Sequence, residues 1–179
     1  GALLQVVEAI ASRADLQGLV KDHARRLPLL VPVNFVGLSL YDAQRDMMRL
    51  HVLRANVPAD IIGGQESHPS DTPAGLVWQT QQPVILSDLA EEHRWPKLIA
   101  LMREDAVQSC CLVPLTSAVR QLGALAFSSL EKDAYRVSDL ELMQQIGRQV
   151  AVAVENVLNR EAAAAARQDV ERQRDRFSL

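Results

Sequence analysis

Two apolar segments on either side of a short polar turn constrain the fold of this chain more than any other feature. Residues 110–115 read Cys-Cys-Leu-Val-Pro-Leu, and residues 122–128 read Leu-Gly-Ala-Leu-Ala-Phe-Ser. Short apolar runs bounded by turn residues are typical of buried strands, so these segments are expected to pair as a hairpin with Arg120-Gln121 at its tip. A capping-box pattern, Ser138 with Glu141, then predicts the start of a very long helix.

Hydrophobic spacing and turn signals predict several shorter elements upstream of that hairpin. Pro after Thr favours a helix start, and alternating apolar residues favour strands. The pattern predicts a first hairpin over 35–41 and 47–55, an edge strand within 59–70, a helix from Thr72-Pro73 to about Gln81, a strand over 83–86 and a helix from Pro96 to about Asp105.

The first part of the chain has helical spacing. Leu3, Val6, Val7, Ile10 and Ala14 recur at three- and four-residue intervals, and a second helical segment over 15–27 ends at Pro28. The elements together predict an α/β (α+β) fold with an antiparallel sheet of five or six strands. The N-terminal and C-terminal helices are expected on one face of the sheet, and the short helices over a ligand pocket on the other.

Composition bounds the class of protein. The chain has 179 residues, 48% of them apolar, which favours one domain with its own core. A net charge of −3 without a basic cluster argues against direct contact with nucleic acid. No apolar run approaches the ~20 residues of a membrane span, so a cytoplasmic location is expected. Residues 1–160 are predicted to form a sensory domain, and the charged segment 161–179 a helical connector to a following domain absent from this chain.

Residue types that carry catalysis or bind metals are scattered. The chain's two cysteines, Cys110 and Cys111, are adjacent, and no CxxC or HExxH spacing occurs. Adjacent strand residues point to opposite faces, so we expect free thiols, at least one strongly buried, with one facing the helices and one facing the pocket. We predict no enzyme activity, no cofactor and no metal site.

Five side chains are candidates for contact with a small-molecule effector. The loops and short helices of 57–105 can fold over the sheet and enclose a pocket. Simple packing is the alternative for the tryptophans and the cysteine, and a solvated surface position for the others. The candidates are His68, Trp78, Trp95, Arg103 and Cys111.

The long predicted helix has more apolar surface than one sheet face can cover. A stripe at three- and four-residue intervals predicts a partner helix in a homodimer, and this stripe is expected to carry the signal. In the single-chain alternative, the N-terminal helix covers the second face. The stripe comprises Met143, Ile146, Val150, Ala153 and Val157.

The block Ser109–Leu115 leading to 122–125, the strand 36–41 ending at Asp42 and the strand-to-helix segment 83–88 resemble GAF domains, over about residues 2–160. Among GAF domains, the chain is most similar to the first N-terminal domain of formate hydrogenlyase transcriptional activator-type, sigma-54-dependent regulators. That resemblance implies a GAF-like, profilin-like fold and a small-molecule-sensing regulatory domain of a bacterial transcriptional activator, which transmits ligand state through its C-terminal helix. The alternative is a ligand-free dimerisation or connector module in a signalling protein.

Overall fold

The structure, a computed structural model, describes residues 33–54 and 61–177. The helices predicted before Pro28 lie outside the described residues. Among the described residues, no helix has the length and apolar content needed to cross a bilayer.

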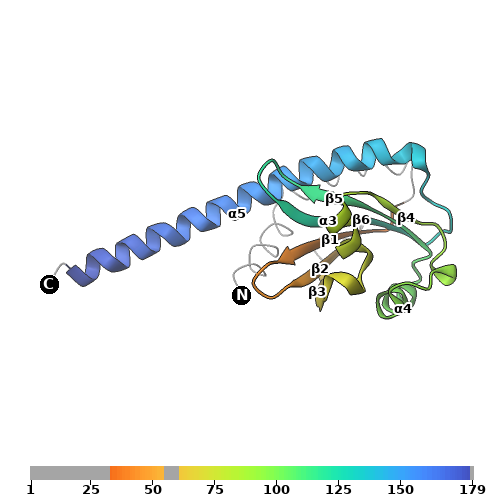
Figure 1. The fold of residues 1–179 in the computed structure, drawn as a ribbon, viewed down its shortest axis with the longest axis horizontal. Coiled ribbons are helices and arrows are strands. Elements are labelled where there is room, and N and C mark those ends of the chain that lie inside the picture. Colours follow the sequence, from red (N-terminus) through yellow and green to blue (C-terminus); the bar gives the residue numbers. More distant parts are fainter. Residues whose placement is uncertain (1–32, 55–60, 178–179) are drawn as a thin grey trace.

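The centre of the molecule is a six-stranded antiparallel sheet (Figure 1). Its strand order is β3-β2-β1-β6-β5-β4, so the two predicted hairpins meet at the β1–β6 pair in the middle. The prediction of an antiparallel sheet of five or six strands is confirmed. The strands are β1 (Phe35–Asp42), β2 (Met47–Arg54), β3 (Ile61–Ser67), β4 (Val84–Leu86), β5 (Ser109–Thr116) and β6 (Gln121–Ser129).

Among the described residues, short helices cover one face of the sheet, and a long helix packs on the other (Figure 1). The short ones are α3 (Pro73–Thr80) and α4 (Pro96–Glu104), and the long one is α5 (Leu140–Phe177). As predicted, Thr72 caps α3, because its hydroxyl accepts a hydrogen bond from the Gly75 amide at 2.9 Å. Three 3-10 turns, Pro69–Asp71, Leu89–Glu91 and Val137–Asp139, complete the connections.

Strand alternation divides the core into two layers. Val36, Leu38, Val113 and Phe127 face α5, with buried residues of that helix packed against them. The other face of the sheet packs α3 and α4 against Cys110, Leu112 and Ala124 among others. Each central strand therefore contributes alternate residues to both layers.

The predicted capping box at the start of the long helix is wrong by two residues. The carboxylate that reaches back to the start of the turn belongs to Asp139. Its Oδ2 accepts a hydrogen bond from the backbone amide of Arg136 at 2.9 Å. Ser138 lies within the 3-10 turn, and α5 begins at Leu140. In both cases the acidic residue follows the first residue of the pair by three positions: Asp139 follows Arg136, and Glu141 follows Ser138. The sequence pattern therefore fits a helical start at either position.

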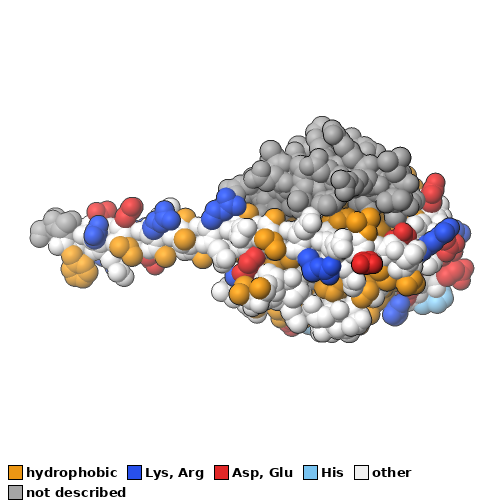
Figure 2. Space-filling model, turned by 90° about the horizontal axis from the view of Figure 1, so that it is seen from above, with side chains coloured by type: hydrophobic (Ala, Val, Ile, Leu, Met, Phe, Trp, Pro, Cys, Tyr) orange, Lys and Arg blue, Asp and Glu red, His pale blue; other side chains and the backbone are white. Residues whose placement is uncertain are grey.

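The stripe assigned to a partner helix packs instead within the single chain. Met143, Ile146, Val150 and Val157 are buried in the layer between α5 and the sheet, and Ala153 is half-buried. The prediction that these side chains face a partner helix is therefore corrected. The same three- and four-residue spacing suits packing on a partner helix or on a sheet, and in this structure the side chains pack on the sheet. From Asn159 to Phe177 every residue of α5 is exposed, and this part projects beyond the sheet (Figures 1 and 2).

Candidate functional site

A cavity of about 100 Å³ lies on the face of the sheet that α3 and α4 cover. Strands β1, β2, β3, β5 and β6 all contribute to its floor, and the start of α3 and one side of α4 contribute to its wall. A volume of this size exceeds the ~10–15 Å³ that one water requires, so the cavity has room for a small molecule. The described lining residues are Phe35, Gly37, Ser39, Met48, Leu50, Val52, Gln65, Ser67, Thr72, Pro73, Ala74, Leu98, Met102, Asp105, Val107, Cys110, Leu112, Ala126 and Ser128.

Small residues on the two central strands create this cavity. Gly37 and Ala126 are paired across β1 and β6, and Ser39 and Ser128 lie beyond them in opposite directions along the strands. A Cβ at position 37 would lie 3.4 Å from both the Ala126 Cβ and the Leu50 Cδ1, which is ordinary contact. The space above these residues is therefore left open by side-chain size, and the two hydroxyls lie toward opposite ends of the floor.

The cavity wall is mainly apolar, with a few polar groups. Ser39 and Ser128 are only 4% and 6% exposed, and neither hydroxyl hydrogen-bonds to another described residue. Among the described lining residues, Asp105 alone is charged. Both serines line the cavity, so a bound molecule with polar groups can form hydrogen bonds to their hydroxyls.

One candidate must be corrected because the strand alternation has the opposite phase. Cys111 is in the layer with α5, and Cys110 lines the cavity. Both thiols are buried, as predicted, and the prediction that they point to opposite faces is confirmed. Burial raises the pKa of the Cys110 thiol strongly and that of Cys111 to about 12, so neither is a thiolate near neutral pH.

The two tryptophans lie outside the cavity lining and make packing contacts. The Trp78 ring stacks on Tyr41 with centroids 3.9 Å apart, and its Nε1 donates to the Gln121 carbonyl at 3.2 Å. Trp95 packs against the α3–α4 layer, and the Arg94 guanidinium carbon lies 4.4 Å from its ring centroid. Their contacts therefore stabilise the short helices that enclose the cavity.

His68 and Arg103 are also absent from the cavity lining. His68 begins the 3-10 turn before α3, where its Nδ1 accepts from the Ser70 amide at 3.3 Å. Its Nε2 lies 3.3 Å from Asp46 Oδ2. Arg103 is exposed near the end of α4. The structure therefore does not bring the five candidates together.

The residues that shape the cavity were missed by sequence reasoning because they are small. The signal was present in the spacing: Gly37 and Ser39 alternate with Val36 and Leu38, while Ala126 and Ser128 alternate with Leu125 and Phe127. When one face of a strand carries small residues and the opposite face carries large ones, the face with the small residues is expected to pack less tightly. In the described part of the chain, no group of His, Cys, Asp or Glu side chains is arranged to hold a metal ion.

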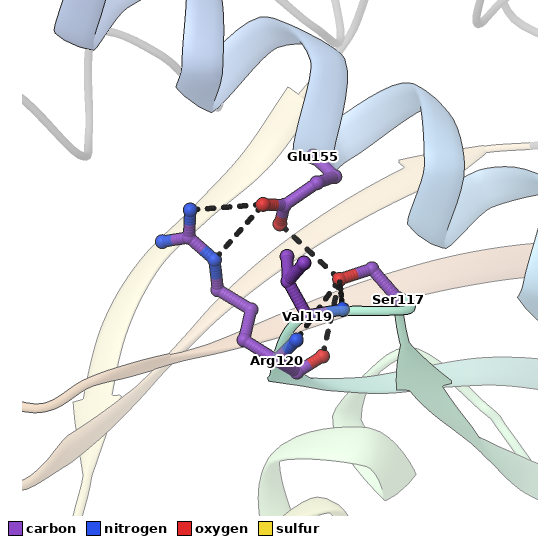
Figure 3. Close-up of polar contacts among 4 residues, drawn as sticks. All are labelled: Ser117, Val119, Arg120 and Glu155. Carbon is purple, nitrogen blue, oxygen red and sulfur yellow. Dashed lines mark hydrogen bonds and ion pairs between the residues drawn. The ribbon is translucent and has the colours of Figure 1, made fainter.

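A polar clamp joins the tip of the β5–β6 hairpin to α5 (Figure 3). The Nε and terminal amine of Arg120 lie 3.1 and 2.9 Å from Glu155 Oε1. The Ser117 hydroxyl lies 3.4 Å from the other carboxylate oxygen and accepts from the Arg120 amide at 3.1 Å. Glu155 is buried on α5, so the clamp fixes the hairpin to the helix near the point where the helix leaves the sheet.

A six-stranded sheet between one long helix and a cavity under short helices defines a class of small α+β domains. The GAF domain family matches residues 11–155. The chain belongs to the GAF domain family.

Among curated proteins, the chain is similar to transcriptional activators of enteric bacteria. It is 24% identical over 164 residues to the formate hydrogenlyase transcriptional activator FhlA of Escherichia coli, covering 87% of this chain and 23% of that protein. It is likewise 24% identical over 165 residues to the activator HyfR of the same organism, covering 86% of the chain and 23% of HyfR. The chain therefore spans about a quarter of the length of these relatives.

Solved structures share the fold at lower identity. The GAF domain of a two-component sensor histidine kinase from Bacillus halodurans superimposes with a TM-score of 0.63 at 19% identity, covering 82% of this chain and 97% of that one. A type II free methionine-R-sulfoxide reductase from Thermoplasma acidophilum has a TM-score of 0.59 at 17% identity, covering 82% and 94%. The same fold therefore occurs in a kinase sensor and in an enzyme.

Proposed function

We propose that this chain is the small-molecule-sensing regulatory domain of a bacterial, sigma-54-type transcriptional activator, located in the cytoplasm. The observation that carries the proposal is the cavity built on the face of the sheet opposite α5. The likeness to FhlA and HyfR supports a role in transcription regulation. In this role, residues 1–160 form the sensor and residues 161–179 connect it to the next domain.

The strands between the cavity and α5 give ligand binding a mechanical route to the helix. On β5, Cys110 and Leu112 face the cavity, while Cys111 and Val113 pack toward α5. Gly147 of α5 sits so close to β5 that a Cβ there would lie 3.0 Å from the Pro114 carbonyl oxygen and 3.1 Å from a Val113 methyl. A close-packed contact transmits displacement, so a ligand that shifts β5 also shifts α5.

The lining favours a compact ligand that is largely apolar and carries hydrogen-bonding groups. Ser39 and Ser128 offer hydroxyls at opposite ends, and Asp105 disfavours an anion near the α4 side. We infer a regulatory rather than a catalytic role; burial raises the pKa of the Cys110 thiol in the cavity, which disfavours thiolate chemistry there. Because a methionine sulfoxide reductase has the same fold, the fold alone does not exclude enzyme activity. The absence of enzyme activity is therefore part of the proposal.

A thermal-shift and calorimetry screen tests ligand binding. The probes are short neutral alcohols and amides alongside small carboxylates, oxoacids and nucleotides, each at the same concentration. A probe present at 100 times its dissociation constant is expected to add about 2.7 kcal/mol to the free energy of unfolding. Failure of every probe to stabilise the protein would favour the alternative, a ligand-free connector module.

Two variants locate the site of any binding detected. Ala126→Leu fills the cavity floor and is expected to abolish binding while the protein remains folded. Ser39→Ala removes one hydroxyl and is expected to weaken binding of a hydrogen-bonding probe about tenfold, as a lost hydrogen bond to a buried group costs about 1–3 kcal/mol. Ser87→Ala, at an exposed position away from the cavity, is the matched control. Unchanged binding in Ala126→Leu would place the ligand elsewhere.

A further inference from the structure

We propose that the cavity selects a short, linear primary amine whose far end carries a neutral hydrogen-bonding group, as in an amino alcohol. This inference rests on the proposed function, because it names the chemical class of the ligand that the cavity senses. The lining carries it through three features: a carboxylate at one end, an apolar middle, and uncharged polar groups at the other end.

The charged end of the cavity lies where the chain leaves α4 and returns to the sheet. Asp105 caps the end of α4 and lines the cavity. Three residues later, the Gln108 amide donates a hydrogen bond to the Ser129 carbonyl at 2.8 Å, which fixes this connection beside the end of β6. The residue before Ser129 is Ser128, which also lines the cavity. Asp105 and Ser128 therefore lie at the same end.

The Asp105 carboxylate is suited to hold a cation. It is the one charged group among the described lining residues, and no ion pair or hydrogen bond joins it to another described side chain. A carboxylate accepts hydrogen bonds, and a primary ammonium has three to donate, so one ammonium can bind Asp105 and the Ser128 hydroxyl together. A ligand with a carboxylate or phosphate at this end would instead meet a like charge.

The middle of the floor is a row of apolar positions. Gly37 pairs with Val52 on one side and with Ala126 on the other, and Ala126 pairs with Leu112. Residues directly opposite one another in antiparallel strands share a face of the sheet, so these four positions form one line across the cavity. The part of a ligand that crosses this line gains free energy by burying methylene groups.

Uncharged polar side chains border the other end. Ser39 pairs with Leu50, Leu50 pairs with Gln65 on β3, and Ser67 follows two residues later. All four line the cavity. Hydroxyl and amide groups both donate and accept hydrogen bonds, so this end suits an alcohol or an amide and offers no opposite charge to an ionised group.

The strand register sets the length of the ligand. Ser128 pairs with Phe35, which precedes Ser39 by four residues on β1. The two serines are therefore about 13 Å apart along the strand, at ~3.3 Å per residue. Hydrogen bonds of about 2.8 Å at each end leave about 7–8 Å for the ligand. Roughly six single bonds of ~1.5 Å span this distance in a zigzag, which is the length of a linear aminopentanol with its two polar groups at opposite ends.

Isothermal titration calorimetry with probes of matched length tests the class of ligand. The linear aminopentanol is expected to bind about fivefold more tightly than pentanediol, which replaces the ammonium by a hydroxyl, because Asp105 is exposed and forms a partly solvated ion pair. The matching hydroxypentanoate should bind more weakly than either. Aminopropanol should bind about tenfold more weakly than aminopentanol, because two buried methylene groups are lost. High salt should reduce the preference for the amine by screening the ion pair.

Two variants locate the charge that gives this preference. Asp105→Asn keeps the size of the side chain, and it should abolish the preference for aminopentanol over pentanediol while binding of pentanediol stays unchanged. Glu104→Gln removes the same charge from the neighbouring exposed residue, which lies outside the described lining, and should keep the preference. Both variants should unfold at the temperature of the parent protein, because both positions are exposed.

The outcomes separate this inference from the proposed function. Equal binding of aminopentanol and pentanediol by the parent protein, or a preference that survives Asp105→Asn, would overturn the amine as the ligand class and leave small-molecule sensing in place. Failure of every probe to bind, neutral and charged alike, would overturn both. A preference lost in Asp105→Asn and kept in Glu104→Gln is the result that we expect.

Discussion

The two faces of the sheet differ in side-chain size more than in polarity. The face toward α5 carries Val36, Leu38, Leu125 and Phe127, which fill the space under the helix. At the intervening positions of the same two strands, the other face carries small residues, and there a cavity remains. One pair of strands therefore builds both a tightly packed layer and an open one.

This difference assigns separate tasks to the two faces. The packed face fixes α5 to β5 so closely that Gly147 has no room for a methyl group without movement of its neighbours. The open face can admit a molecule without first breaking the core. A change on the open face reaches α5 through the backbone of the shared strands, and this requires the packed face to be rigid.

The largest expected effect is the loss of Phe127 from the packed face. Phe127 is 2% exposed in the layer with α5, so Phe127→Ala should lower the free energy of unfolding by about 3–5 kcal/mol through lost burial and a new cavity. Its neighbour Ser128 faces the open side, and Ser128→Ala should change stability by less than about 0.5 kcal/mol. Urea denaturation followed by circular dichroism measures both. Equal losses would show that the two faces are packed alike.

A smaller effect is expected at the clamp that ties the packed face together. Among the described residues, Arg120→Ala leaves the buried Glu155 carboxylate with the Ser117 hydroxyl as its one polar side-chain contact, which should cost about 1–3 kcal/mol. The double variant Arg120→Ala/Glu155→Gln should recover part of this loss, because no unpaired charge is then buried. The same denaturation measurement applies, and an Arg120→Ala variant as stable as the parent would show that the clamp is dispensable.

Local signals were sufficient to predict the strands and the short helices. The short apolar run over 110–115, followed by a polar turn, predicts a buried strand, and a hydroxyl before Pro73 predicts a helix start because the cap is formed within one turn. The GAF-like fold followed from the order of these elements. Each of these features depends on residues close together in the sequence, so its outcome changes little with the rest of the fold.

Features that depend on distant contacts were not predictable in the same way. Alternation shows that Cys110 and Cys111 face opposite sides, but the side taken by α5 depends on the path of the chain after Ser129. Long α5 has apolar residues on several sides, and only the packed sheet decides that Val150 is buried and Val152 exposed. The buried Glu155 has the same cause, since its partner Arg120 is 35 positions away.

The adjacent cysteines provide the last and smallest test, because they sample both faces at once. The thiol pKa in the unfolded chain is near 9.0, and burial raises the pKa of Cys111 to about 12 in the folded protein and that of Cys110 as well. A raised folded-state pKa contributes stability that is complete below pH 9 and is lost as the pH rises. Above pH 9 each thiol should therefore lower the free energy of unfolding by at most about 1.4 kcal/mol per pH unit.

Denaturation at a series of pH values between 8 and 10 measures this slope. Cys110→Ala and Cys111→Ala should each remove about half of the cysteine contribution, whatever their effect on stability at pH 8, because either thiol ionises only in the unfolded chain.

A ligand in the cavity contacts the face of Cys110 alone, so it should slow thiol modification at Cys110 and leave Cys111 unchanged. If only one cysteine contributes to the pH dependence of the free energy of unfolding, the other thiol must be accessible to water in the folded protein. The face that holds that thiol would then be less tightly packed than proposed.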